Sequence, residues 1–127
     1  MWLCLFDGAT VWIRTEGPPR GRAGLWASTA AHLAAVDAPV DTPVVGLPPG
    51  GSFAATFLQN GLALDRDAVE RETVEAGRVL LREHPAVDAI VLECTNLPPY
   101  KQALQRALSV PVFDVIDLLR DFRKSLG

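Results

Sequence analysis

The chain has 127 residues, of which 49% are hydrophobic and 21% charged, and its formal net charge at pH 7 is −3. This length suits a single domain with its own core, and the mild acidic balance argues against a nucleic-acid-binding surface. No apolar run approaches the roughly 20 residues that span a bilayer, so neither a membrane span nor a signal peptide is expected. The two cysteines form no CxxC pair, which predicts neither a disulfide scaffold nor a zinc site and favours a reducing, cytoplasmic setting.

The first 19 residues predict a β-hairpin-like extension followed by a linker. Apolar residues alternate on both sides of Asp7-Gly8, and an Asp-Gly pair between two such runs favours a tight hairpin turn. The segment 15–22 is rich in Gly, Pro and Arg and separates the extension from the remainder of the chain. We therefore expect an extension at 1–19 and one α/β domain at 20–127.

Strand-like and helix-like segments alternate along this domain. Short apolar runs predict strands at 23–27, 43–47, 89–92 and 111–113. Capping residues and helical spacing predict helices at 29–35, 53–60, 65–84, 98–108 and 115–122. This alternation implies a parallel sheet with right-handed crossovers. The prediction is a flavodoxin-like three-layer α/β sandwich with a parallel sheet of about four strands in the order 2-1-3-4.

Cys94 is the strongest candidate for a catalytic residue. It follows the apolar strand 89–92, and the prolines at 98–99 suit the first turn of a helix. A helix N-terminus that faces a thiol favours the thiolate, which is the reactive form. Thr95 and Asn96 place a hydroxyl and an amide beside the thiol, and free N–H groups of the helix could hold a carboxylate.

Ligands of open α/β sheets bind beyond the carboxyl ends of the strands, where four predicted loops meet. They contain Ser28 and Thr29, which are further candidates for substrate binding, the segments 48–52 and 94–96, and Asp114. No cofactor motif and no set of metal ligands is found. The alternatives to a site at Cys94 are a thiol that packs as a small apolar group and a Thr95 or Asn96 that only caps the helix.

The segment VLECTNLPPY at 91–100, with SVPVFD at 109–114, resembles the aspartate/glutamate/hydantoin racemase superfamily. The resemblance implies two similar α/β halves that face each other, with one cysteine in each and no cofactor. One thiolate removes the α-proton of an amino acid or related small carboxylic acid, and the other thiol returns a proton. Cys94 would then be the acid/base of the second half, with the substrate carboxylate held by Thr95 and Asn96.

The cysteine of the first half has no match in this chain, which resembles the second half alone. Three functions therefore stay open. They are racemase-like proton transfer by Cys94, a single-cysteine enzyme that resembles arylmalonate decarboxylase, and a non-catalytic half that binds small acids. A homodimer could rebuild the cleft with Cys94 from each copy.

Overall fold

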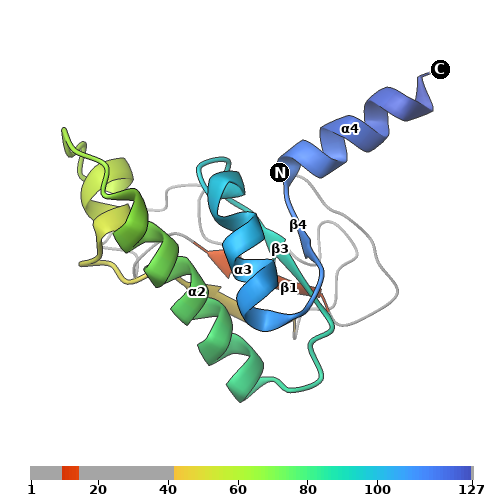
Figure 1. Ribbon diagram of the computed structural model, residues 1–127, viewed down its shortest axis with the longest axis horizontal. Helices are drawn as coiled ribbons and strands as arrows, with labels where there is room; N and C mark the ends of the chain where they lie inside the picture. Colours follow the sequence, from red (N-terminus) through yellow and green to blue (C-terminus); the bar gives the residue numbers. More distant parts are fainter. Residues whose placement is uncertain (1–9, 15–41, 127) are drawn as a thin grey trace.

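The computed structural model describes residues 10–14 and 42–126 (Figure 1). In chain order the elements are β1 (Thr10–Arg14), β2 (Val44–Gly46), the π-helical turn η1 (Ala54–Leu58), α2 (Arg66–Glu83), β3 (Ala89–Leu92), the 3₁₀ turn η2 (Pro98–Tyr100), α3 (Lys101–Leu108), β4 (Val112–Phe113) and α4 (Val115–Ser125). The strand expected at 23–27 and the helix expected at 29–35 lie outside the described residues. None of the helices within the described ranges is long and apolar enough to cross a membrane.

The strands form one parallel sheet in the order β2-β1-β3-β4. The Cα of Trp12 is level with Val44 on one side and with Val91 on the other, and Ile90 is level with Val112. The predicted mixed α/β architecture with a parallel sheet is therefore confirmed. Between β2 and β3, where the predicted order has the strand 23–27, the sheet contains β1; residues 23–27 lie outside the described ranges.

The predicted hairpin is wrong for the residues of β1. At Trp12 and Ile13 both edges of β1 are paired with parallel strands, so no antiparallel partner can join there. An Asp-Gly pair is a local turn signal, whereas the position of a strand in a parallel sheet depends on pairing with distant segments. The sheet thus includes residues on both sides of the boundary expected at residue 20.

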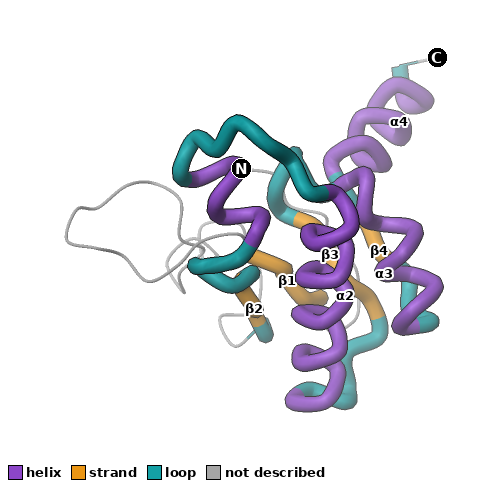
Figure 2. The backbone as a smooth tube through the Cα atoms, turned by 60° about the vertical axis from the view of Figure 1, so that its left-hand side comes forward, coloured by secondary structure: helices purple, strands orange, loops and turns teal. Residues whose placement is uncertain are grey.

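Helices α2 and α3 pack side by side against one face of the sheet (Figures 1 and 2). Asp65 starts α2 as its N-cap and accepts a hydrogen bond from the N–H of Ala68 at 2.9 Å. Four residues of α2 at 4-3-4 spacing form a buried stripe: Val69, Thr73, Ala76 and Leu80. They pack with apolar side chains of the sheet and of α3, including Ile90, Leu92, Leu104 and Val112.

The opposite face of the sheet is also apolar at β3. Side chains alternate along a strand, so Val91 points away from the core that Ile90 and Leu92 share with α2 and α3, and Val91 is nevertheless 7% exposed. Helix α4 leads away from the sheet (Figure 1). No residue of α4 is buried, and its apolar residues Leu119 and Phe122 are 55% and 61% exposed. The described residues thus show one helical layer on the sheet.

Candidate functional site

The candidate site lies at the carboxyl edge of the sheet, where the loops after parallel strands meet. β3 and β4 are neighbours, so the turn that contains Cys94 lies beside Asp114 at the end of β4. The loop at 48–52 follows β2, which is separated from β3 by β1. Neighbouring strands are about 4.8 Å apart, so this loop starts about 10 Å from the turn of Cys94. Ser28 and Thr29 lie outside the described residues.

Cys94 occupies the strand-to-helix turn that the sequence predicts. It follows the buried end of β3 and is half-buried, with part of its side chain against the core. The N–H of Leu97 donates to the carbonyl of Cys94 at 3.1 Å, and the N–H of Asn96 points at its Sγ at 3.4 Å. This contact places a hydrogen-bond donor beside the sulfur.

The structure of the residues after Cys94 excludes one alternative and limits one expectation. Neither Thr95 nor Asn96 caps a helix, because Leu97 and Tyr100 occupy the N-cap positions of η2 and α3 without a side-chain cap bond. The helix N-terminus also offers few free donors, since both prolines lack an N–H and the N–H of Tyr100 already donates to Leu97 at 2.9 Å. The polar side chains of Thr95 and Asn96 are exposed on this turn.

The next turn of chain is fixed in the core. Leu97 is fully buried and Tyr100 is 3% exposed. Burial raises the pKa of the Tyr100 hydroxyl, the nearby charge of Arg66 lowers it and that of Glu70 raises it, with a net upward shift. Tyr100 is thus a buried anchor that keeps its proton at neutral pH.

A charged cluster that the sequence did not reveal joins α3 to α4. Lys101 Nζ forms an ion pair and hydrogen bond with Asp117 Oδ2, and it lies 3.8 Å from Asp114 Oδ2. Asp114 caps α4 as predicted, because its Oδ1 accepts the N–H groups of Ile116 at 2.8 Å and Asp117 at 3.0 Å. Asp117 Oδ2 accepts the N–H of Asp114 at 2.9 Å in return, which completes a capping box.

The pKa of Asp117 is lower than that of an ordinary aspartate. Partial burial alone would raise it, but hydrogen bonds from Lys101 and the Asp114 backbone, with the charges of Lys101 and Arg120, outweigh that effect. Asp117 is therefore ionised at neutral pH. Together with the Asp114 side chain, which is 4% exposed, it holds Lys101 at the carboxyl edge.

The loop after β2 is organised by a carboxylate from α2. Glu72 accepts hydrogen bonds from the N–H of Ser52 at 2.5 Å and from the N–H of Phe53 at 3.1 Å. Gly51 makes room for this contact, because a Cβ at this position would lie 2.7 Å from Glu72 Oε1. The donors of this loop are thus already occupied by a side chain of the protein.

The described histidine does not join the turn of Cys94. His84 is exposed and ends α2, near the amino end of β3 and therefore opposite Cys94. His32 and Cys4 lie outside the described residues. Within the described ranges no group of three or more His, Cys, Asp or Glu side chains could hold a metal ion.

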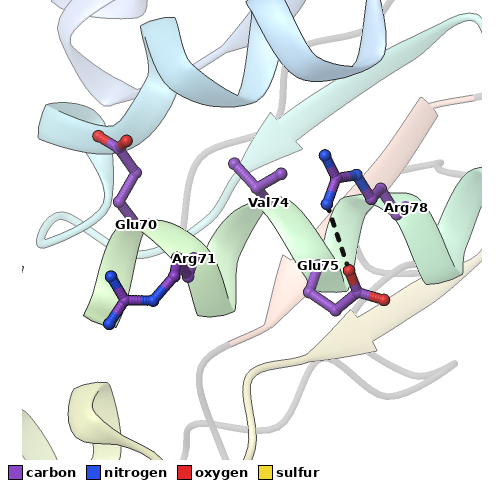
Figure 3. Close-up of a pocket in the computed structure, with 5 residues that line it drawn as sticks. All are labelled: Glu70, Arg71, Val74, Glu75 and Arg78. Atoms are coloured by element: carbon purple, nitrogen blue, oxygen red, sulfur yellow. Dashed lines mark ion pairs between the residues drawn. The ribbon is translucent and has the colours of Figure 1, made fainter. Parts of the chain in front are cut away.

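A shallow depression on α2 is not the site either. The described residues that line it all belong to this one helix: Glu70, Arg71, Val74, Glu75 and Arg78 (Figure 3). Its ion pair, between Arg78 Nη1 and Glu75 Oε2 at 3.5 Å, has both side chains more than half exposed. The described lining thus comes from one helix and includes neither Cys94 nor the residues of its turn.

Comparison with known proteins connects the chain with one enzyme name. It is 42% identical over 59 residues to dimethylsulfoniopropionate lyase 5 of Emiliania huxleyi (strain CCMP1516), which is 46% of this chain and 12% of that protein. It is 37% identical over 57 residues to a dimethylsulfoniopropionate lyase of Durusdinium sp. clade D, 45% of this chain and 19% of that protein. It is 34% identical over 71 residues to dimethylsulfoniopropionate lyase 7 of Emiliania huxleyi, which is 53% of this chain and 21% of that protein. The chain thus matches no more than about a fifth of the length of these relatives.

No family model matches the chain, and no solved structure matches it significantly. The relatives overturn the resemblance to the racemase superfamily, because they carry the name of a lyase and not of an isomerase. The functions that depended on that resemblance are wrong with it: racemase-like proton transfer, a decarboxylase of the arylmalonate type and a non-catalytic racemase half. The error lies in the reaction assigned to the turn of Cys94; the position of the turn is as predicted.

Proposed function

We propose that this chain supplies elimination chemistry of the dimethylsulfoniopropionate lyase type, with Cys94 as the base. The observation that carries the proposal is a half-buried thiol in a strand-to-helix turn at the carboxyl edge of a parallel sheet, in a chain similar to proteins of that name. Because the match covers a small part of each relative, the activity of the whole relatives is attributed to this chain only as part of the proposal.

The substrate has a carboxylate at one end and a dimethylsulfonium group at the other. In the elimination, the base takes a proton from the carbon next to the carboxylate. The electron pair of that C–H bond forms the C=C bond of acrylate, and the C–S bond breaks with its pair on sulfur. Dimethyl sulfide leaves as a neutral molecule, so the leaving group needs no proton. Elimination therefore requires one acid/base group of the protein, where racemisation requires two.

A reaction that requires one acid/base group fits this chain better than racemisation, which requires two. Cys94 supplies the thiolate that accepts the proton, and the N–H of Asn96 supports negative charge on its sulfur. The exposed side chains of Thr95 and Asn96 bind the substrate carboxylate. Ser28 and Thr29 stay predicted substrate-binding residues. No second thiol is needed, so the homodimer stays a prediction on which the mechanism does not depend.

The proposal extends to the fold and the cellular setting. A flavodoxin-like three-layer sandwich would place a second helical layer on the sheet face opposite α2 and α3, and the burial of Val91 on that face supports it. A thiol that works as a base must stay reduced, which supports the cytoplasmic setting expected from the sequence.

The test is product formation by the purified chain. With dimethylsulfoniopropionate as substrate, we expect dimethyl sulfide in the headspace and an equal amount of acrylate in solution. Substrate that carries deuterium on the carbon next to the carboxylate should react more slowly, because that C–H bond breaks in the elimination. A chain that releases no more dimethyl sulfide than a heat-unfolded sample of the same chain would refute the proposal.

A further inference from the structure

The turn that contains Cys94 is attached to the fold at both ends. Its first end continues from β3, which is paired with β1 and β4. Its second end continues through Leu97 and Tyr100, both buried, to Lys101 at the start of α3. The side chain of Lys101 then reaches α4 and pairs with Asp117, 16 residues further along the chain.

These contacts form a closed ring of chain segments and non-covalent contacts that includes the turn of Cys94. From Cys94 the chain runs to Lys101, the ion pair crosses to Asp117, and the capping box joins Asp117 to Asp114. Asp114 directly follows β4, where Phe113 is level with Val91 of β3. The ring therefore returns to the strand from which the turn of Cys94 starts.

The ion pair that closes the ring is well shielded from solvent. The side chains of Lys101 and Asp117 are 19% and 25% exposed. The ion pair between Lys124 and Asp121 on the same helix α4 has side chains that are 78% and 74% exposed. Exposed pairs contribute little because water and salt screen them, and partial burial reduces that screening. The pair of Lys101 with Asp117 is therefore shielded enough to connect α3 with α4.

We propose that Lys101 is a positioning residue, which fixes the turn of Cys94 through its ion pair with Asp117. The inference rests on the proposed role of Cys94 and its neighbours as a site for a small carboxylic acid. Lys101 acts through the turn and not as a ligand, because its ammonium group is already held by Asp117 with Asp114 beside it. These two carboxylates exceed its single charge, which disfavours an added substrate carboxylate.

The experiment compares two alkylating reagents on Cys94 in a Cys4→Ser background, where Cys94 is the single thiol. Iodoacetate carries a carboxylate next to its reactive carbon, and iodoacetamide carries a neutral amide there. Both react with the thiolate, so the ratio of their rates does not depend on how much thiol is ionised. We divide this ratio by the same ratio measured for the chain unfolded in urea. The normalised ratio measures how strongly the folded turn favours the reagent with a carboxylate over the neutral reagent.

We expect this normalised ratio to exceed one, and Lys101→Met to lower it by about three- to tenfold, or about 0.7–1.4 kcal/mol at 1.36 kcal/mol per factor of ten. Lys101→Arg should restore most of it, because arginine can form the same pair. Lys124→Met removes an exposed lysine of equal charge and should leave the ratio unchanged.

The Asp117→Asn variant distinguishes a positioning role of Lys101 from direct attraction of the anionic reagent by its charge. The asparagine oxygen can still accept the N–H of Asp114, while the ion pair with Lys101 is lost. If Lys101 positions the turn, this variant lowers the ratio as Lys101→Met does. If Lys101 acts only by attracting the anionic reagent, removing a negative charge raises the ratio, and the inference is overturned.

The two proposals fail in different ways. A normalised ratio of one in the parent protein would reject the carboxylate site and the role of Lys101 together. A ratio above one that no substitution of Lys101 or Asp117 changes would reject the role of Lys101 alone. Urea unfolding of each variant shows that it is folded, and if Lys101→Met does not fold, Asp117→Asn and Lys101→Arg decide the outcome.

Discussion

Two neighbouring glycines in the loop after β2 should respond in opposite directions to the same substitution. A Cβ on Gly51 would lie 2.7 Å from Glu72 Oε1 and 2.8 Å from both Glu72 Cδ and Oε2. Gly51→Ala therefore pushes the carboxylate away from the N–H groups of Ser52 and Phe53. A Cβ on Gly50 has no atom within 4 Å. Neither glycine has a left-handed φ, so alanine is compatible with the backbone at both positions.

The magnitudes result from two opposing terms. A hydrogen bond to a charged group contributes about 1.5–3 kcal/mol to stability, and Gly51→Ala loses at least one. Alanine lowers the conformational entropy of the unfolded chain, which stabilises the fold by about 0.4–1 kcal/mol. The free energy of unfolding should thus fall by about 1–2 kcal/mol for Gly51→Ala and rise by about 0.4–1 kcal/mol for Gly50→Ala.

Urea unfolding followed by far-UV circular dichroism measures both changes. Repeating Gly51→Ala in a Glu72→Ala background completes a double-mutant cycle. With the carboxylate gone, the added methyl group has space, and the substitution should become neutral or stabilising. The reasoning is refuted if Gly51→Ala is as destabilising without Glu72 as with it, or if both glycine substitutions change the stability by the same amount.

Three further sets of substitutions test the core, the charged cluster and a helix end. Leu104→Ala, at a fully buried residue, should destabilise the protein by about 2.7–5 kcal/mol in urea unfolding, whereas Leu119→Ala at a 55% exposed residue should change it by less than about 0.5 kcal/mol; equal effects would contradict the described core. The lowered pKa of Asp117 means that its ionised form stabilises the fold fully above the ordinary aspartate value of 3.8 and that this contribution is lost as the pH falls through the lower pKa of the folded state. The stability advantage over Asp117→Asn should therefore shrink between about pH 5 and the acid limit of the fold, and an advantage that grows in acid would reverse the assigned direction. Ser109 ends α3 with φ 57°, so Ser109→Gly should raise the urea midpoint by relieving about 1 kcal/mol of backbone strain, while Ser109→Ala, which keeps that strain, should give no such gain.

Local patterns predicted the elements that depend on local interactions. The helix expected at 65–84 is observed as Arg66–Glu83, with Asp65 as its cap and its apolar stripe buried. The strand expected at 89–92 has the same bounds in the structure. Caps, helical spacing and a short apolar run all act within a few residues, so one sequence contains enough information to locate these elements.

Features that depend on distant pairing could not be predicted. The residues of β1 fit a hairpin by their local turn signal, yet both edges of the strand are taken by segments more than 25 residues away. The ion pair of Lys101 with Asp117 and the hydrogen bonds of Glu72 to Ser52 join residues 16 and 20 positions apart. No spacing rule connects such positions, because the pairs exist only once the helices pack on the sheet.

The position of the turn that contains Cys94 was predicted, while its role as a site stays a proposal. Cys94 lies in the expected turn, while the prolines that mark the helix start also remove the N–H groups expected to bind a carboxylate. Racemisation and elimination both begin by removing a proton from the carbon next to a carboxylate. The residues around one thiol therefore do not distinguish them, and the similarity to proteins named lyases is the ground on which elimination is proposed.

The role of Cys94 as the base is tested most directly by replacing each cysteine in turn and measuring dimethyl sulfide release from dimethylsulfoniopropionate. Cys94→Ser should abolish release above the background of the heat-unfolded chain, because a serine hydroxyl is too weak an acid to supply an anion at neutral pH. Cys4→Ser should keep the rate of the parent protein. Release that persists in Cys94→Ser and disappears in Cys4→Ser would contradict the account.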